Sequence, residues 1–337
     1  MNSIEEFVDG DTDGLPALPI LVLHAHSSCN CRCVMCDIWK TKETKIFGMR
    51  DLEPQLESIR RLRVRWIVFS GGEPLMNPEL PQLCAILRRE GIRLTLLSTG
   101  LLLKKNVGAV AESFNDVIVS LDGPSEIHDT IRRVEGAFAL LETGVRALRD
   151  VRSDMRVTAR TTVQQANHRS LLETARAAGT LSLNGISFLA VDVTSTAFNR
   201  ALVWPKTRQT KVGLSLPEIT ALENEIEMLI RASQEEFAAG FIAESPGKLW
   251  RIVRHFRSQL GLEFSESPVC NAPWVSAVIE ADGAVRPCFF HAPIGNLQGT
   301  TLEAVINGAK ARQFRQTLDI PNNPICRNCV CSLNYRS

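Results

Sequence analysis

The chain lacks an apolar stretch long enough to cross a lipid bilayer, because its longest hydrophobic runs are far shorter than a membrane-spanning helix. It also lacks the basic start and apolar core of a secretory signal, since residues 1–15 are acidic. Its 38 lysines and arginines nearly balance 37 aspartates and glutamates, so the net charge of +1 gives no electrostatic argument for binding nucleic acid or an anionic membrane. We therefore expect a cytoplasmic protein with neither as a partner.

With 337 residues, 45% of them hydrophobic, the chain can bury a large α/β domain and a smaller unit. Apolar segments alternate with segments of helical periodicity between residues 19 and 191. Strands are expected at 19–26, 65–70, 93–98, 116–121, 156–163 and 185–191, and helices at 50–62, 78–90, 104–112, 135–150 and 169–179. This alternation predicts a parallel sheet with right-handed crossovers. Six units are too few for a closed eight-stranded barrel, so we predict a partial (β/α)6 TIM-like barrel with its chemistry at the carboxyl ends of the strands.

The rest of the chain follows a different pattern. Residues 192–214 read as a loop, after which Ser215 and Glu218 form a capping box that opens a helix to about residue 239. A second helix is expected at 247–260. A hairpin around Asp282 and Gly283 and a helix at 301–315 make up a small α+β unit. We thus divide the chain into an N-terminal extension (1–18), a core (19–191), a helical linker or substrate-shaping segment (192–263) and a C-terminal domain (264–337).

Ten cysteines fall into two groups, and Cys84 stands apart in a helical pattern that suggests core packing. The front group is Cys29, Cys31, Cys33 and Cys36, and the back group is Cys270, Cys288, Cys326, Cys329 and Cys331. Such grouping in a large chain without an export signal favours metal binding over disulfides. Buried free thiols are the alternative, which the regular spacing of the front group disfavours.

Three front cysteines, Cys29, Cys33 and Cys36, have the spacing C-x3-C-x2-C directly after an apolar segment. One short loop can therefore present three thiolates to one cluster. A structural cubane [4Fe–4S] cluster has a cysteine on each of its four irons, so three cysteines leave one iron open for another ligand.

The cysteine array is followed by Ser70-Gly-Gly-Glu-Pro74 at the end of the next expected strand. Together the two motifs resemble those of radical S-adenosylmethionine (SAM) enzymes. The resemblance implies that Cys29, Cys33 and Cys36 are the catalytic cluster ligands and that SAM binds the open iron. It implies reductive cleavage of SAM to a 5′-deoxyadenosyl radical, which takes a hydrogen atom from the substrate. An electron donor such as flavodoxin or ferredoxin would supply the electron.

The same resemblance identifies residues expected to contact SAM. These are Met35, Gly71, Gly72, Glu73, Ser98, Ser120 and Arg160. Glu73 would hold the amino group of SAM, and Arg160 its carboxylate, although a salt bridge is the alternative for Arg160. The stretch from Ser120 to Arg132 matches the pattern S-x-D-G-P-x3-H-D-x2-R of one subgroup, in which His128 and Asp129 either cap a helix or contact substrate. Trp39 either shields the cluster or packs in the core.

The back cysteines resemble the SPASM/twitch domain of the same family. The resemblance implies one auxiliary [4Fe–4S] cluster for electron transfer, held by Cys270, Cys288, Cys326 and Cys329, with Cys331 as a rival for the last position. Tetrahedral zinc is the alternative, because zinc ribbons use similar spacing. Cys31, inside the front array, is interpreted as a small packed side chain, although it could also be a nearby fourth thiol or a hydrogen-atom donor.

These features predict a radical SAM oxidoreductase of the dehydrogenase or epimerase type. The short segment before the first expected strand is too small for a leader-binding module, which favours a small-molecule or short-peptide substrate. The expected class is a sugar, an aminocyclitol or another small natural-product intermediate. A maturase of ribosomally made peptides is the alternative within the family. A radical SAM methyltransferase and a non-enzymatic iron–sulfur or zinc protein are further alternatives, which the products formed from SAM would distinguish.

Overall fold

The computed structural model describes residues 14–264, 267–331 and 333–336. The expected N-terminal extension, residues 1–18, lies mostly outside this described part. A nine-stranded sheet forms the centre, in the order β6-β5-β4-β3-β2-β1-β7-β8-β9. No helix within the described ranges is both long and apolar enough to cross a membrane.

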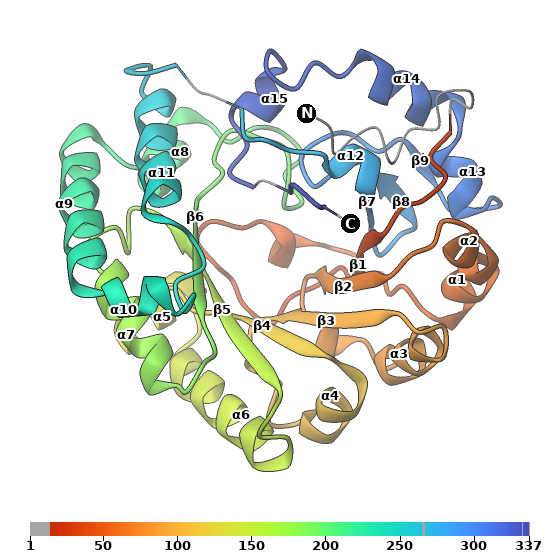
Figure 1. The fold of residues 1–337 in the computed structure, drawn as a ribbon, viewed down its shortest axis with the longest axis horizontal. Coiled ribbons are helices and arrows are strands. Elements are labelled where there is room, and N and C mark those ends of the chain that lie inside the picture. The colour runs from red at the N-terminus through yellow and green to blue at the C-terminus, as the bar shows by residue number, and fades with distance from the viewer. Residues whose placement is uncertain (1–13, 265–266, 332, 337) are drawn as a thin grey trace.

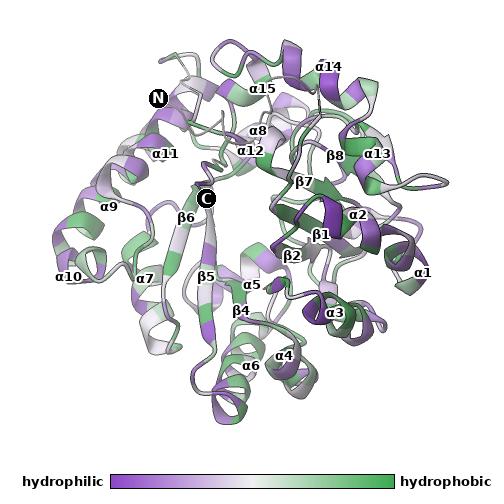
Figure 2. Cartoon of the chain, turned by 45° about the vertical axis from the view of Figure 1, so that its right-hand side comes forward, coloured by the Kyte–Doolittle hydropathy of each residue, from purple (hydrophilic) through white to green (hydrophobic). Residues whose placement is uncertain are grey.

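Six parallel strands form the first part of the sheet in chain order. They are β1 (Ile20–His26), β2 (Trp66–Gly71), β3 (Arg93–Ser98), β4 (Asp116–Ser120), β5 (Arg156–Val163) and β6 (Ile186–Ala190). Their side chains are mainly hydrophobic, although β5 includes hydrophilic residues (Figure 2). β6 is an edge strand, so the sheet curls without closing (Figure 1). The predicted open, partial barrel is therefore confirmed.

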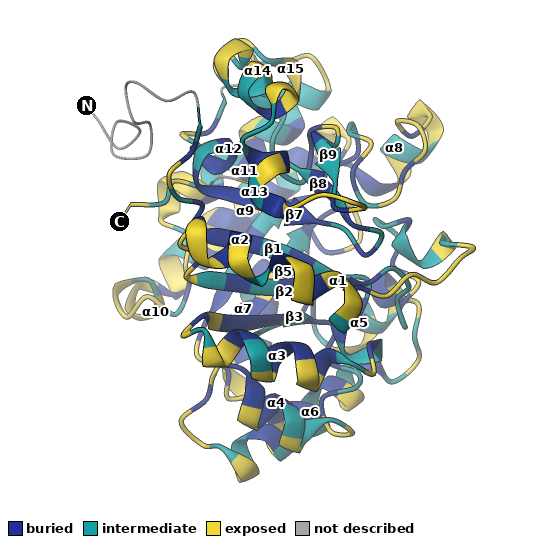
Figure 3. Cartoon of the chain, turned by 90° about the vertical axis from the view of Figure 1, so that its right-hand side faces the viewer, coloured by how far each residue is buried: buried dark blue, intermediate teal, exposed yellow. Residues whose placement is uncertain are grey.

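Helices cover the outer face of this sheet, with buried inner faces and exposed outer faces (Figure 3). They are α1 (Met49–Leu52), α2 (Leu56–Arg61), α3 (Leu80–Arg89), α4 (Val107–Ser113), α5 (Ser125–Arg132), α6 (Ala137–Val151) and α7 (Leu171–Thr180). The expected single helix at 50–62 is wrong, because the 3-10 turn η3 (Glu53–Gln55) separates α1 from α2. Pro54 lies in this turn and has no amide hydrogen to continue the helix.

Four helices follow the last barrel strand. They are α8 (Lys206–Val212), α9 (Leu216–Ala232), α10 (Gln234–Ala238) and α11 (Pro246–Gln259). The expectation of a loop over 192–214 is wrong at its end, because α8 begins after Pro205, whose fixed φ suits a helix start. The capping box is confirmed: the Ser215 amide donates to the Glu218 carboxylate at 2.8 Å.

The C-terminal part contains the predicted hairpin and four short helices. Its elements are α12 (Ala272–Val275), β7 (Ser276–Ile279), β8 (Ala284–Arg286), β9 (Gly295–Asn296), α13 (Leu302–Ile306), α14 (Ala309–Thr317) and α15 (Pro324–Arg327). The expected helix at 301–315 is two helices, because Gly308 is the N-cap of α14 in extended conformation. Unexpectedly, β7 pairs in parallel with β1, so the C-terminal hairpin extends the barrel sheet.

Candidate active site

The three front cysteines predicted as cluster ligands lie on one loop, between β1 and the 3-10 turn η2 (Ile38–Lys40). Cys33 is buried, whereas Cys29 and Cys36 are half-buried. Cys31 is also buried, in agreement with its interpretation as a packed side chain. Hydrogen bonds with the Cys31 thiol lower the pKa of Cys29 and lower that of Cys33 to about 6. The loop therefore brings its sulfur atoms together and favours thiolates at two of them.

The end of α5 holds this loop in place. The amide of Val34 donates to the carbonyl of Ile131 at 3.0 Å, and the amide of Arg32 donates to the carbonyl of Arg132 at 3.1 Å. Carbonyls at the last turn of a helix have no partner within the helix, so the cysteine loop satisfies two of them. The loop conformation is thus set by backbone contacts as well as by the sulfur atoms.

The side chain of Arg132 reaches the loop too. Its Nη1 donates to Cys33 Sγ at 3.5 Å, and its Nη2 lies 2.5 Å from Asp122 Oδ2. Both charged side chains are buried, so each depends on the other to offset the loss of water. The positive charge of Arg132 further lowers the pKa of Cys33 and would stabilise a thiolate bound to iron.

The other two residues of this motif have local structural contacts. His128 Nδ1 accepts a hydrogen bond from the Asp122 amide at 3.2 Å. Asp129 accepts from the amides of Gly136 and Phe138 at the start of α6, at 2.7 and 2.8 Å. The helix-capping interpretation therefore fits Asp129, although the residue itself lies within α5.

Gly71 and Gly72 let the next strand end approach the cysteine loop. A Cβ on Gly72 would lie 1.9 Å from the carbonyl oxygen of Ser28, the residue before the first cysteine. Gly71 has φ +109°, and a Cβ there would lie 2.9 Å from the Cβ of His24. Only glycine fits at these two positions, because any side chain would push β2 away from the loop.

Glu73 is fully buried beside these glycines. Its carboxylate accepts hydrogen bonds from Ser98 Oγ at 2.9 Å, from Thr99 N and Thr99 Oγ1 at 2.7 Å, and from Leu75 N at 3.1 Å. No ion pair within the described part of the chain involves Glu73, and burial raises its pKa. A buried carboxylate with donors but no cation is suited to the positively charged amino group of a ligand.

The remaining predicted SAM contacts lie around the same end of the sheet. Ser120 ends β4 and is paired in register with Arg160 on β5, so the two side chains share one face of the sheet. Arg160 is exposed, and its Nε donates only weakly to Ser187 Oγ at 3.4 Å. Met35 is half-buried on the cysteine loop. Arg160 is thus available to an anion, and the described part of the chain forms no salt bridge with it.

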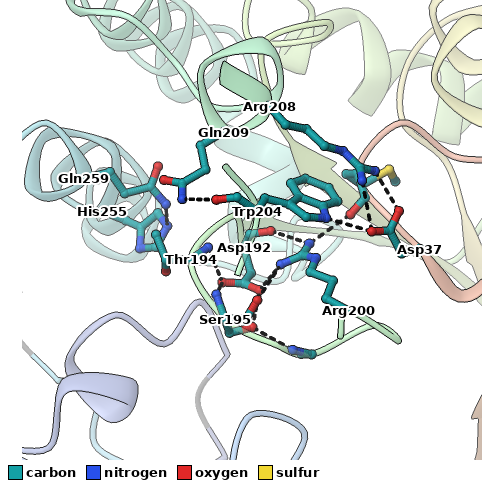
Figure 4. Close-up of polar contacts among 12 residues, drawn as sticks. Asp37, Asp192, Thr194, Ser195, Arg200, Trp204, Arg208, Gln209, His255 and Gln259 are labelled. Atoms are coloured by element: carbon teal, nitrogen blue, oxygen red, sulfur yellow. Dashed lines mark hydrogen bonds and ion pairs between the residues drawn. The ribbon is translucent and has the colours of Figure 1, made fainter. Parts of the chain in front are cut away.

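A segment after β6 packs on the cysteine loop, and Figure 4 shows its contact with Asp37, the residue after Cys36. The buried guanidinium of Arg200 donates to Asp192 Oδ2 at 2.7 Å and to the carbonyl of Met35 at 3.1 Å. The ring of Trp204 lies between the guanidinium carbons of Arg200 and Arg208, which are 3.9 and 3.7 Å from its centre. This stack attaches the segment 192–208 to the loop that carries the cysteines.

The stack is also bonded to Asp37, the residue after Cys36. Asp37 accepts from Trp204 Nε1 at 2.7 Å and from both terminal nitrogens of Arg208 at 2.9 and 2.7 Å (Figure 4). Burial alone would raise the pKa of Asp37, but Arg208, Lys40 and Trp204 hold it at about 2. Trp39, in contrast, donates to the carbonyl of Cys36 at 2.9 Å, which places it against the cluster loop.

The back cysteines gather at the other end of the chain. Burial and repulsion from Cys288 and Cys270 raise the pKa of Cys326 to about 11, and burial and repulsion from Cys331 raise that of Cys329. The amide of Asn271 donates to the carbonyl of Leu333 at 2.8 Å, which ties the last described residues to the start of this domain. The structure thus brings together the two distant parts of the predicted ligand set.

Two features distinguish the individual back cysteines. His291 Nε2 lies 3.3 Å from Cys326 Sγ, and its ring packs edge-on against Phe314. Cys331 differs from Cys329 because its pKa also responds to Arg160 and Asp192 of the barrel. Cys331 is thus within electrostatic reach of Arg160 and Asp192.

Both cysteine groups suit iron–sulfur clusters by donor chemistry. Each provides several thiols, which are the usual ligands of such clusters, and the front group has a cation at Cys33. Among the described residues, no three His, Cys, Asp or Glu side chains converge as ligands of a single metal ion. The thiolates of a cubane each bind a different iron, so they need not converge on one point.

Sequence reasoning missed several residues of this site. Thr99 and Asn30 connect Glu73 to the cysteine loop, since Thr99 Oγ1 lies 3.1 Å from Asn30 Oδ1. The segment with Arg200, Trp204 and Arg208 carried no motif that could have indicated its contacts. The Asp122–Arg132 pair, however, lies in the subgroup pattern, whose internal Asp and Arg were the available signal. Cys84 is buried in the core, as expected.

Comparisons with known proteins agree with this geometry. The model of the radical SAM superfamily matches residues 26–178, and the model of an iron–sulfur cluster-binding domain, SPASM, matches residues 270–330. The first region contains the cysteine loop, Glu73 and Arg160. The second contains Cys270, Cys288, Cys326 and Cys329.

Individual relatives are distant. Fe-coproporphyrin III synthase from Methanosarcina barkeri is 29% identical over 161 residues, which cover 45% of this chain but only 39% of that protein. AdoMet-dependent heme synthase from Nitratidesulfovibrio vulgaris is 23% identical over 319 residues, covering 90% of this chain and 82% of that protein. The crystal structure of Streptococcus suis SuiB bound to precursor peptide SuiA has a TM-score of 0.66 at 15% identity, covering 95% of this chain and 73% of that chain, and so has the same fold.

Proposed function

Because the chain belongs to the radical SAM superfamily and carries a SPASM domain, we propose that Cys29, Cys33 and Cys36 hold its SAM-binding [4Fe–4S] cluster. The observation that carries this proposal is the buried carboxylate of Glu73, which has no cation partner among the described residues and lies beside the cysteine loop. When bound, the cluster and SAM supply a 5′-deoxyadenosyl radical that abstracts a hydrogen atom from the substrate.

The protein residues would bind and orient SAM. Glu73, fixed by Ser98 and Thr99, would hold the amino group of SAM by a charge-assisted hydrogen bond. Ser120 and Arg160 would hold its carboxylate from the neighbouring strands β4 and β5. The segment with Arg200 and Trp204 packs on the cysteine loop and would limit the access of water to bound SAM.

We further propose that Cys270, Cys288, Cys326 and Cys329 hold one auxiliary [4Fe–4S] cluster. Four cysteine ligands would leave no iron open, so this cluster would transfer electrons and would not bind substrate directly. His291 would donate a hydrogen bond to the Cys326 thiolate and stabilise its charge. Three expectations stay predictions. They are the division of the chain at residues 19, 192 and 264, an electron donor of flavodoxin or ferredoxin type, and a cytoplasmic location.

For the reaction we propose an oxidoreductase that acts on a small molecule. A sugar or aminocyclitol fits the dehydrogenase or epimerase type, and the relatives named Fe-coproporphyrin III synthase and AdoMet-dependent heme synthase also point to small molecules. The alternative is a peptide substrate, since SuiB, which has the same fold, binds the precursor peptide SuiA in its crystal structure. Formation of S-adenosylhomocysteine from SAM would instead favour a methyltransferase.

The test is to reconstitute the protein with iron and sulfide without oxygen, and to add SAM and dithionite. We expect 5′-deoxyadenosine and methionine as products. Cys29→Ala, Cys33→Ala and Cys36→Ala should each abolish this cleavage, whereas the buried core variant Cys84→Ala should retain it. If the wild-type protein binds iron but forms no 5′-deoxyadenosine, the non-enzymatic interpretation is correct.

A further inference from the structure

A cavity of about 180 Å³ lies between the two proposed cofactor sites. Its walls come from β5, β6, α11 and the segment 329–331 near the C-terminus. Arg160, the proposed partner of the SAM carboxylate, lines one side, and Cys329 and Cys331 line another. A larger cavity of about 390 Å³, between residues 258–264 and 322–328, contains none of the predicted site residues.

The smaller cavity is lined by more positive than negative side chains. Arg160, Lys248 and Arg251 face a single carboxylate, Glu244. The Glu244 carboxylate accepts the amide of Phe188 at 2.8 Å, and burial raises its pKa. Within the described ranges, none of the three cations forms an ion pair. The lining therefore has three cationic side chains against one carboxylate, which leaves an excess of positive charge.

The arrangement of α11 explains why these charges face the cavity. Lys248, Arg251 and His255 are three and four positions apart, so they lie on one face of the helix. The adjacent face is apolar and buried, with Leu249 and Phe256 fully covered. Across the cavity, Arg160 and Ser187 are neighbours in register on β5 and β6. Helix and strand thus direct polar groups into the same space.

The cavity also adjoins the segment that covers the cysteine loop. His255 Nε2 and Gln259 Nε2 lie 2.7 Å apart on α11, on one side of the group formed by Asp192, Ser195 and Arg200 (Figure 4). A molecule in the cavity would therefore lie between the proposed SAM contacts and the back cysteines, and next to the covering segment.

We propose that Lys248 and Arg251 bind an oxyanionic group of the substrate, a carboxylate or a phosphate, and so position the substrate beside Arg160. This inference rests on the proposed function in one respect, namely that the anion bound in the cavity belongs to the substrate. A guanidinium and an ammonium on one helix face bind either anion by charge-assisted hydrogen bonds. Arg160 remains the partner of SAM, while α11 supplies the contacts specific to the substrate.

The test measures binding of two probes, citrate and inorganic phosphate, to the reconstituted protein with SAM by isothermal titration calorimetry at constant ionic strength. We expect saturable binding of one probe per chain, and the probe that binds more tightly identifies the anion. The double variant Lys248→Gln/Arg251→Gln should weaken that binding by about tenfold or more. Lys248→Gln alone, at an exposed position that the fold does not require, should weaken it less.

Arg231→Gln is the matched control, because Arg231 is exposed on neighbouring α9 and does not line the cavity. Unchanged affinity in the control and tenfold weaker affinity in the double variant would support the inference. Absence of saturable binding, or equal affinity in all variants, would overturn it. 5′-Deoxyadenosine formation in the same samples tests the proposed function separately, since it requires neither probe.

Discussion

The guanidinium of Arg132 donates a hydrogen bond to the sulfur of Cys33 at 3.5 Å, although the residues are 99 positions apart in the chain. The same guanidinium is paired with buried Asp122, so the charge at Cys33 is fixed by the end of β4 and by α5. A cation at one cluster ligand stabilises the added electron when the cluster is reduced. The motif around Asp122 thus contributes to the proposed redox site, and not only to capping.

Replacement of Arg132 by glutamine should remove the positive charge that pairs with the buried carboxylate of Asp122. A buried carboxylate left without its partner costs about 3–5 kcal/mol, so Arg132→Gln should lower the free energy of unfolding by that amount. Urea denaturation of the apoprotein measures this loss. Iron per chain after reconstitution should fall as well, because Cys33 loses its donor.

The double variant Asp122→Asn/Arg132→Met distinguishes stability from redox tuning. Removing both charges should restore most of the free energy of unfolding. The reduction potential of the front cluster, measured by EPR-monitored titration, should nevertheless become more negative than in the wild type. An unchanged potential would show that Arg132 serves the fold alone.

The fold and the centre of the site could be predicted because they depend on local patterns. Alternating apolar segments predicted the parallel sheet, and the spacing of Cys29, Cys33 and Cys36 predicted the ligand loop. Gly72 was predicted only as a contact of SAM. The structure shows that it also allows close approach to the carbonyl of Ser28, which a sequence pattern does not specify.

Contacts between distant segments could not be predicted in this way. β7 joins β1 through backbone pairing across more than 250 positions, with Leu23 beside Ile279, and backbone hydrogen bonds leave no mark on side-chain type. The sequence predicted a loop around Trp204. It did not indicate that Arg200, Arg208 and Asp37 surround the Trp204 ring. Arg200, Trp204 and Arg208 stand four positions apart, but the segment that holds them has no helical pattern of apolar residues, so this spacing did not indicate the stack.

Glu73→Gln should weaken SAM binding while the cluster is retained. The amide keeps the shape of the carboxylate but not the charge that would hold the SAM amino group. We expect the Kd for SAM, measured by equilibrium dialysis on the reconstituted protein, to rise at least about tenfold, as for a lost charge-assisted bond. Glu79→Gln is the control, since the Glu79 carboxylate accepts the amide of Met49 near the start of α1, lies outside the predicted SAM contacts and should leave the Kd unchanged.

Cys326→Ala and Cys331→Ala test the choice of auxiliary ligands. Cys326→Ala should remove about half of the iron and leave some uncoupled SAM cleavage, because the front cluster does not depend on it. Cys331→Ala should keep the full iron content if Cys329 is the fourth ligand. If Cys331→Ala loses as much iron as Cys326→Ala while Cys329→Ala does not, Cys331 is the fourth ligand in place of Cys329. Intact iron and turnover in Cys326→Ala would contradict the whole ligand set.

Trp204→Ala should detach the covering segment from the cysteine loop. The ring is buried between two guanidiniums and donates to Asp37, so its removal should cost roughly 3–5 kcal/mol, as for large aromatic side chains in cores. Trp204→Phe keeps an aromatic face for Arg200 and Arg208 but lacks the N–H donor, and it should lose much less. Hydrogen exchange by mass spectrometry gives the decisive readout. Amides of residues 35–41 and 192–208 should exchange faster together in Trp204→Ala, because both segments are held by the same stack. Faster exchange in residues 192–208 alone would mean that α5 and Arg132 are sufficient to fix the cysteine loop.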